Sequence, residues 1–170
     1  MKLKHISHLI TGSVMELFGV MADGKVVNSY ELTNKRGAKL KVINYGATVT
    51  SLKIPLKSGE MVDVVLGFDT LENYINSFDL ESAPYLGATV GRYAGRINNA
   101  TFNLNGEIIH LDKNNNGHSL HGGKDNFSKK VWEVKNVNEG CSPSITFGYL
   151  SPANEGNYPG DLSVELTYTL

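Results

Sequence analysis

The chain has 170 residues, of which 41% are hydrophobic and 19% are charged, and 16 Lys and Arg against 17 Asp and Glu give a formal net charge of −1. This composition is typical of a globular domain with a sizeable core and excludes a disordered chain. No basic run crosses the sequence, so we expect no nucleic-acid partner.

The first ten residues contain two lysines but no continuous apolar run behind them, so no signal peptide is predicted. No segment has the length and apolarity of a membrane span. We therefore predict a cytoplasmic protein with no membrane partner. Cys141 is the only cysteine, which excludes an internal disulfide, and its Gly-Cys-Ser-Pro surroundings indicate an incidental loop cysteine rather than a nucleophile.

Short alternating segments separated by Gly and Asn dominate the chain. Residues 38–45 alternate between apolar and polar side chains, which predicts a half-buried strand. Residues 63–66, Asp-Val-Val-Leu, are mostly apolar and predict a short buried strand. A single helical turn is predicted from Leu71 to Ile75, capped by Asp69 or Thr70.

A hairpin is predicted in the second half of the chain. Residues 101–104 and 107–111 flank Asn105-Gly106, a pair that supplies the positive φ angles of a type I′ turn. Alternation returns at Trp132 and Val134 and again over residues 145–149. Many short strands separated by turns predict an all-β fold, a β-sandwich or a barrel, in one structural unit without an internal boundary.

The last segment, residues 163–170, alternates strictly and predicts a half-buried strand. Such a strand normally continues into a hairpin partner, so we expect the chain to be truncated. An isolated piece should expose the apolar face of this strand and dissolve poorly.

The first of three polar clusters, residues 87–99, sets Arg92 and Arg96 among glycines. Its glycine spacing matches neither a phosphate-binding P-loop nor a dinucleotide fingerprint. One interpretation is close-packed backbone with solvent-facing arginines. The other is that an arginine donates paired hydrogen bonds to neighbouring hydroxyls of a sugar.

The second cluster, residues 114–123, contains His118 and His121. Their spacing would suit two metal ligands on a helix, but the flanking glycines disfavour a helix and no third ligand lies nearby, so no metal is predicted. Either histidine could bind the loop backbone. Alternatively, a histidine on a glycine-rich loop is suited to hydroxyl recognition or proton transfer.

The third cluster, residues 154–161, contains Glu155 and Asp161. We interpret it as a turn with two surface carboxylates. A carboxylate pair for glycoside hydrolysis is the alternative, and the spacing does not favour it.

Six segments of the chain occur in the order found in the aldose 1-epimerase, or galactose mutarotase, family, which the chain resembles from about Phe18 to its end. The segments are Asn44 to Leu52, Asp63 to Asp69, Gly87 to Ile97, Ser119 to Gly123, Val131 to Glu133 and Glu155 to Gly160.

The resemblance implies a large antiparallel β-sandwich roughly twice as long as this chain. Residues 1–170 would then be the N-terminal portion of one mutarotase-like domain. Arg96 matches the sugar-contacting arginine of the family, although Gly95 stands where the family usually has Asn. His121 matches the histidine that lines the site and assists binding and proton transfer. Arg92 is expected to brace its loop.

The resemblance also implies interconversion of the α and β anomers of free hexoses such as glucose or galactose, without a cofactor. In the family, the general-acid histidine, a sugar-binding aspartate and the general-base glutamate follow the strand that ends here at Leu170. We therefore expect residues 1–170 alone to be inactive. Arg96 and His121 must converge on one pyranose. The expected partner is a monosaccharide, and the protein is expected to be a monomer or a homodimer.

Two alternatives remain. A non-catalytic carbohydrate-binding module would keep Arg96 and His121 without the acid and base. A relative that acts on hexose phosphates would need extra Arg or Lys side chains to hold a phosphate, and no surplus cation stands out in the sequence.

Overall fold

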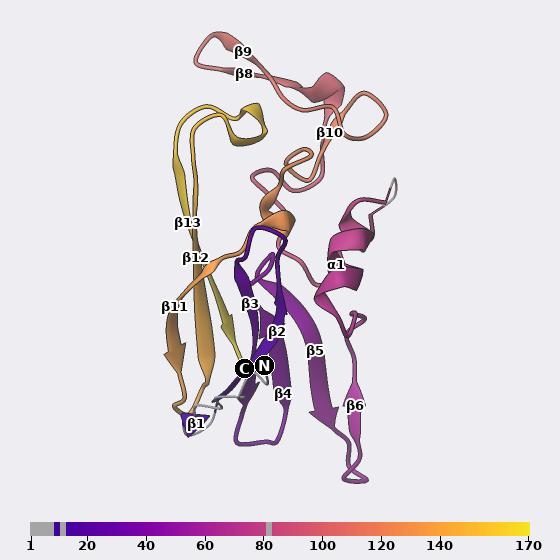
Figure 1. Ribbon diagram of the computed structural model, residues 1–170, viewed down its shortest axis with the longest axis vertical. Helices are drawn as coiled ribbons and strands as arrows, with labels where there is room; N and C mark the ends of the chain where they lie inside the picture. The colour runs from indigo at the N-terminus through magenta and orange to yellow at the C-terminus, as the bar shows by residue number, and fades with distance from the viewer. Residues whose placement is uncertain (1–8, 11–12, 81–82) are drawn as a thin grey trace.

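The computed structural model describes residues 9–10, 13–80 and 83–170. In this part of the chain an antiparallel sheet runs in sequence order from β1 to β6 (Figure 1). Its strands are β1 (Leu9–Ile10), β2 (Ser13–Val20), β3 (Val26–Thr33), β4 (Lys39–Ile43), β5 (Thr48–Pro55) and β6 (Met61–Asp63). Because each strand pairs with the next, short turns are sufficient to connect them.

A second antiparallel sheet is formed by the end of the chain, in the order β11-β12-β13. Its strands are β11 (Glu133–Asn138), β12 (Ser144–Ser151) and β13 (Leu162–Thr169). The segment between the sheets folds into two small strand pairs, a helix and two short 3₁₀ turns. These are β7 (Arg96–Ile97) with β10 (Ser119–Leu120), β8 (Thr101–Leu104) with β9 (Glu107–His110), α1 (Leu71–Phe78), η1 (Asn98–Ala100) and η2 (Phe127–Lys129). A further 3₁₀ turn, η3 (Glu155–Asn157), lies in the connection between β12 and β13.

The main core lies between the two sheets. Leu40 and Val42 of β4 pack in one buried cluster with Ile145 and Phe147 of β12. Trp132, the only tryptophan, is 1% exposed in the same cluster and donates its indole N–H to the carbonyl of Phe127 at 3.1 Å. Two antiparallel sheets that bury alternate residues against each other form a β-sandwich, as predicted.

The strand β13 is the last strand of the second sheet. The expectation that its apolar face would lie exposed is only partly correct. Val164, Leu166 and Tyr168 are half-buried because they pack against the main core, and the Tyr168 hydroxyl donates to the carbonyl of Ala47 at 2.8 Å. The polar residues between them face solvent, so the predicted alternation is confirmed.

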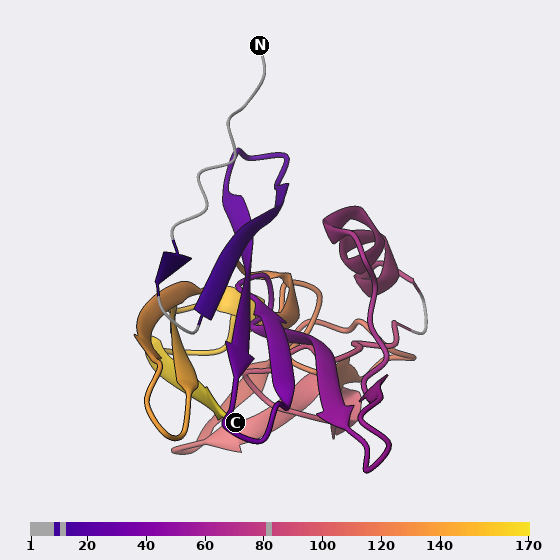
Figure 2. The same ribbon diagram turned by 90° about the horizontal axis from the view of Figure 1, so that it is seen from below.

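The helix α1 packs on the opposite face of the six-stranded sheet (Figure 2). Leu71, Tyr74 and Phe78 contact a cluster that includes Val27 and Ile43, which alternate with the strand residues that face the other sheet. The helix begins at the predicted cap, since the Thr70 hydroxyl accepts the amide of Asn73. It ends at Phe78, three residues beyond the predicted Ile75.

The predicted hairpin is confirmed. Asn105 and Gly106 have φ angles of 53° and 91°, and Leu104 pairs with Glu107 across the turn. Phe102 and Ile109 of the hairpin pack against a small buried cluster of Ala100, Leu111 and Tyr158.

The prediction of a buried strand over residues 63–66 is wrong. The strand β6 ends at Asp63, and Val64 and Leu66 are 60% and 78% exposed. The carboxylate of Asp63 accepts hydrogen bonds from the amides of Leu52 and Val65. This side-chain bond to the backbone two residues further on replaces the strand ladder and turns the chain away from the sheet.

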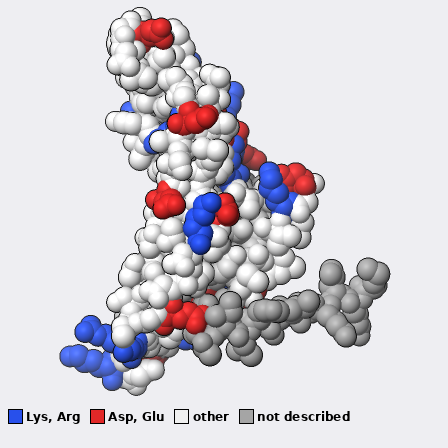
Figure 3. All heavy atoms as spheres, turned by 90° about the vertical axis from the view of Figure 1, so that its left-hand side faces the viewer, with Lys and Arg blue, Asp and Glu red and all other residues white. Residues whose placement is uncertain are grey.

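Among the described residues, no helix has the length and apolarity to cross a membrane. On the face shown in Figure 3, Lys and Arg are scattered among Asp and Glu, without one continuous basic surface. Cys141 lies in a loop, as expected, and is exposed.

Candidate functional site

The short strand pair β7–β10 brings the predicted site residues together. Leu120 is paired with Arg96 in this ladder. The pairing continues beyond it, because the amide of His121 donates to the carbonyl of Gly95 at 2.9 Å and the amide of Gly95 donates to Nδ1 of His121 at 3.1 Å. Arg96 and His121 are thereby fixed on adjacent chain segments, although 25 positions separate them in the sequence.

The imidazole of His121 has a defined proton arrangement. Because Nδ1 accepts a backbone hydrogen bond, the proton of the neutral ring must sit on Nε2. Burial, followed by the positive charge of Arg96, lowers the pKa of His121 below its ordinary value. The ring packs edge to face with Tyr85, at 5.1 Å between centroids. At neutral pH the side chain therefore presents an Nε2–H donor.

Arg96 is anchored at one nitrogen. Its Nε donates to Oδ1 of Asn115 at 3.0 Å, which leaves the two terminal nitrogens available to a ligand. The side chain is exposed to solvent. A guanidinium with two free terminal nitrogens can donate to two neighbouring hydroxyls at once.

His118 has a structural role. Its Nδ1 accepts the amide of Asn99 at 3.1 Å, and its backbone pairs with Asn115, the residue that holds Arg96. No group of three possible metal ligands occurs among the residues that the structure describes.

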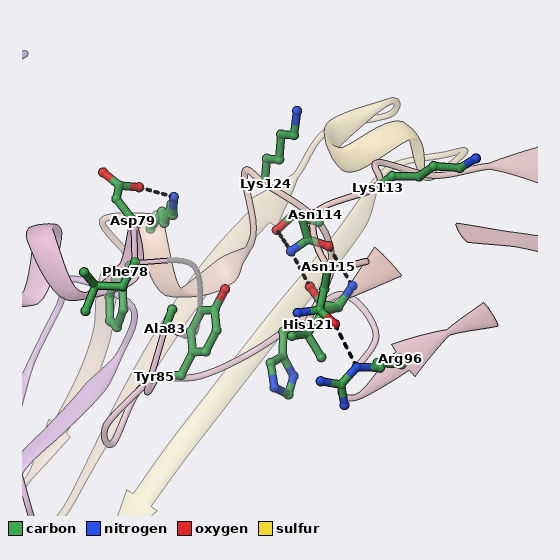
Figure 4. A pocket seen from close by; sticks show the side chains of 14 residues that line it. Phe78, Asp79, Ala83, Tyr85, Arg96, Lys113, Asn114, Asn115, His121 and Lys124 are labelled. Carbon is green, nitrogen blue, oxygen red and sulfur yellow. Dashed lines mark hydrogen bonds and ion pairs between the residues drawn. The ribbon is translucent and has the colours of Figure 1, made fainter. Parts of the chain in front are cut away.

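Arg96 and His121 line one cavity of about 640 Å³ (Figure 4). The end of α1 and Tyr85 form its apolar wall, and the loops around β10 form the other side. The lining residues are Phe78, Asp79, Leu80, Ala83, Tyr85, Arg96, Lys113, Asn114, Asn115, Leu120, His121, Gly123, Lys124 and Lys129. The volume is within the range of small-molecule sites.

The cavity contains more positive charge than the sequence suggested. Lys113, Lys124 and Lys129 line it together with Arg96, whereas Asp79 is its only carboxylate among the described lining residues. No surplus cation stands out in the sequence because these lysines are spread over separate segments. Only the fold gathers them.

Asn114 ties the cavity loops together. Its side-chain amide donates to the carbonyls of Leu120 and Gly123, and its Oδ1 accepts the amide of Leu120 at 2.7 Å. The segments before and after His121 are therefore bound to the same side chain.

Arg92 braces the loops behind the cavity, as expected. It makes five hydrogen bonds, which reach the Ser151 hydroxyl and the carbonyls of Ser151, Pro152, Pro159 and Gly160. Its guanidinium also lies 5.7 Å from the centre of the Tyr158 ring. These contacts leave Arg96 as the arginine directed to the cavity.

Glu155 is not the surface carboxylate that the sequence predicted. Its side chain is only 9% exposed, forms an ion pair with Lys130 at 2.7 Å, and accepts hydrogen bonds from the hydroxyls of Tyr149 and Ser151. Burial raises the pKa of this carboxyl, but Lys130 and the two hydroxyls outweigh burial and lower the pKa below its ordinary value. Asp161 is exposed, as predicted, and accepts the amide of Ala153.

Three glycines allow the site loops to stack. A Cβ added at Gly122 would overlap the carbonyl oxygen of Gly91, and one added at Gly156 would lie 2.7 Å from the carbonyl oxygen of Gly122. The loops that carry Arg92, His121 and Glu155 therefore touch through their backbones.

Similar proteins identify the family of the chain. A family model described as Aldose 1-epimerase matches residues 28–170. The chain belongs to the aldose 1-epimerase family. The predicted galactose mutarotase-like fold is likewise confirmed by the solved structures.

The matches to individual relatives cover most of the chain of this aldose 1-epimerase family member. The chain is 42% identical over 132 residues to "Galactose mutarotase" from Bos taurus, and the match covers 78% of this chain and 36% of that protein. It is 36% identical to "Aldose 1-epimerase" from Haemophilus influenzae, covering 87% and 40%. The crystal structure of galactose 1-epimerase from Lactobacillus acidophilus superposes with a TM-score of 0.77 at 26% identity, covering 93% of this chain and 44% of that one. The chain spans about two fifths of the length of these relatives.

Proposed function

We propose that the protein interconverts the α and β anomers of free aldoses, with hexoses such as glucose and galactose as substrates. The observation that carries this proposal is the convergence of the Arg96 guanidinium and the neutral His121 imidazole on one cavity of about 640 Å³. The names of the relatives, galactose mutarotase and aldose 1-epimerase, support it.

The reaction needs proton transfer at two oxygens. A base removes the proton of the C1 hydroxyl while an acid protonates the ring oxygen, the ring opens to the aldehyde, and rotation about C1–C2 precedes closure on the other face. Each correctly placed acid or base contributes about 10²- to 10⁴-fold. The chemistry transfers no electrons, so we infer that it needs no cofactor.

Arg96 and His121 would hold the sugar in this reaction. The terminal nitrogens of Arg96 are free to bind neighbouring hydroxyls, and Nε2–H of His121 can donate to an oxygen of the ring or of a hydroxyl. The family resemblance implies a general-acid histidine and a general-base glutamate after position 170. We accordingly assign neither role to His118, Glu155 or Asp161.

Polarimetry tests the proposal. The protein expressed from its complete coding sequence should speed the mutarotation of freshly dissolved α-D-glucose or α-D-galactose, whereas residues 1–170 alone should not. If the complete protein binds the sugar but the optical rotation changes no faster than in buffer, the non-catalytic binding module replaces the enzyme. An active 1–170 chain would contradict the assignment of the acid and base.

We also infer that residues 1–170 form the N-terminal portion of a single mutarotase-like domain. The coverage of the relatives, 36% to 44% of their length, supports this organisation. The cytoplasmic location and the monomeric or dimeric state stay predictions.

A further inference from the structure

Arg96 combines a fixed backbone with an exposed side chain. Its backbone is held by the pairing with Leu120 in the β7–β10 ladder, but several rotatable bonds separate that backbone from the guanidinium. Among the described residues, its one side-chain hydrogen bond is the bond from Nε to Oδ1 of Asn115 at 3.0 Å, which Figure 4 shows beside the His121 ring. The orientation of the guanidinium therefore depends on Asn115.

The turn that carries Asn115 is tied back to the strand that carries Arg96. Asn115 and His118 exchange two backbone hydrogen bonds, of 3.2 and 2.8 Å. Nδ1 of His118 accepts the amide of Asn99 at 3.1 Å, and Asn99 lies in η1, which directly follows β7. The acceptor and the arginine are consequently attached to one local unit and cannot move apart independently.

A neutral amide is well suited to hold an arginine that must bind a ligand. The side chain of Asn115 has one acceptor oxygen and no charge, so it engages Nε and leaves both terminal nitrogens with their donors. A carboxylate in its place could accept from Nε and from a terminal nitrogen together, in the paired geometry that arginine favours. Such a carboxylate would compete with the ligand, whereas Asn115 restrains the guanidinium without occupying its binding nitrogens.

We propose that Asn115 is a positioning residue for the sugar site, which holds the Arg96 guanidinium ready for the sugar with both terminal nitrogens open to the cavity. This inference rests on the proposed sugar site. A long side chain that becomes ordered only on binding lowers affinity, and a side chain that is already ordered avoids this cost. Asn115 acts through Arg96, unlike its neighbour Asn114, whose side chain binds only the loop backbone.

A double-mutant cycle on the protein from its complete coding sequence tests the proposal. The ligand is 1,5-anhydro-D-glucitol, which lacks the C1 hydroxyl and cannot undergo mutarotation, and its affinity is measured by NMR titration. Asn115→Ala should weaken binding about 2- to 10-fold, because the sugar must then order the guanidinium. In the Arg96→Met background the same substitution should leave the affinity unchanged, because the residue through which Asn115 acts is absent.

Asn103→Ala is the matched control. Asn103 is exposed, its side chain accepts the amide of Gly106 in the β8–β9 turn, and it does not line the cavity. This variant loses an asparagine that also accepts one hydrogen bond, and it should bind the analogue as tightly as the unaltered protein.

The Nε–H signal of Arg96 provides a test that needs no substitution and decides if Asn115→Ala does not fold. NMR relaxation should show this N–H group to be as rigid on the picosecond-to-nanosecond timescale without the analogue as with it. It should also be more rigid than the Nε–H group of Arg36, which is exposed in the turn between β3 and β4.

The outcomes separate this inference from the proposed function. No loss of affinity in Asn115→Ala, an equal loss in both backgrounds, or an Arg96 Nε–H as mobile as that of Arg36 overturns the positioning role and leaves the sugar site standing. If the analogue does not bind, or binds equally well to Arg96→Met, the proposed sugar site fails and this inference fails with it.

Discussion

His121 combines an uncommon backbone conformation with a fixed tautomer. Its φ of 53° lies in the left-handed region, and its Nδ1 is occupied by the amide of Gly95. Left-handed backbone is strained for most residues but tolerated by Asn. Separate contacts therefore fix the backbone and the ring of His121. A substitution can remove the ring and keep the backbone conformation.

The variant His121→Asn should keep the loop and lose the imidazole donor. We expect the free energy of unfolding to change by less than about 1 kcal/mol, and kcat/KM for mutarotation to fall about 10- to 100-fold because one hydrogen bond to the sugar is lost. Chemical denaturation and polarimetry, both on the protein expressed from its complete coding sequence, measure the two effects. His121→Ala is the comparison, since it should lose stability as well. Wild-type rates in His121→Asn would contradict the role of the ring.

The same variant should change the acid response of the fold. The pKa of His121 is lowered in the folded state, so below its ordinary value of 6.5 the unfolded chain binds the proton more readily. His121 therefore reduces stability as the pH falls below 6.5, until the ring protonates in the folded state as well. In His121→Asn this part of the acid sensitivity should disappear, which denaturation curves at several pH values would reveal.

The sequence indicated some site residues and not others. Two arginines and two histidines stood out in glycine-rich clusters, and only the family resemblance selected Arg96 and His121 among them. The β7–β10 ladder explains why these two meet. The burial of Glu155 was not readable, because its partners Lys130, Tyr149 and Ser151 lie outside its own segment. The position of Lys113 and Lys124 at one cavity was equally hidden, because the Asn114 side chain joins their two segments only in the folded chain.

At the scale of elements, α1 connects the sheet to the cavity. Leu71, Tyr74 and Phe78 pack on the sheet, and Phe78 together with the C-cap residue Asp79 also lines the cavity. Isolated helices of this length are not stable in water. The position of the cavity wall consequently depends on packing and on the cap at Thr70.

Removal of the helix cap should loosen this wall. We expect Thr70→Ala to lower the free energy of unfolding by about 1 kcal/mol, because the amide of Asn73 loses its acceptor. Hydrogen exchange should rise across α1 more than in β12. Thr70→Asp, which restores a cap, should recover most of the loss. Equal stability of the Ala and Asp variants would show that the cap contributes little.

Elements whose geometry depends on neighbouring residues in the sequence were predicted correctly. The end of β6, where a side chain competes for backbone hydrogen bonds, was not. The Asn105-Gly106 turn dictates its own geometry, so the hairpin was readable. The run at residues 63–66 has the composition of a strand, yet the carboxylate of Asp63 captures the backbone amides that a ladder would use. Composition alone does not reveal that competition.

At the scale of the whole molecule, the Glu155 network joins the site loops to the second sheet. Tyr149 and Ser151 belong to β12, Lys130 follows η2, and Arg92 reaches the same Ser151 hydroxyl from its own loop. A buried charge held by several partners is costly to disturb on one side only. The network therefore couples the position of the cavity to the integrity of the sandwich.

Neutralising this carboxylate should weaken the fold. We expect Glu155→Gln to lower the free energy of unfolding at neutral pH by about 2 kcal/mol, since Lys130 loses one of its two carboxylate partners. The lowered pKa of Glu155 means that its contribution is present above the unfolded-state pKa and is lost as the pH falls through the folded-state pKa.

Denaturation of the Glu155→Gln variant as a function of pH measures both effects. The difference from the wild-type protein should be largest at neutral pH and vanish in acid. Asp161→Asn is the control, because Asp161 is exposed and should change stability much less. A difference that persists unchanged into acid would contradict the ionised network.

The burial of Trp132 gives the protein its own optical probe. Residues 1–170 contain one indole, so its emission from this part of the protein reports from a single place, next to Phe127 and Tyr149 and inside the sandwich core. Emission should be blue-shifted while the sheets are closed and move to longer wavelength when they separate. Because Phe127 also packs against Gly91 in the site loops, fluorescence offers a label-free way to follow both unfolding and movements of the sugar cavity.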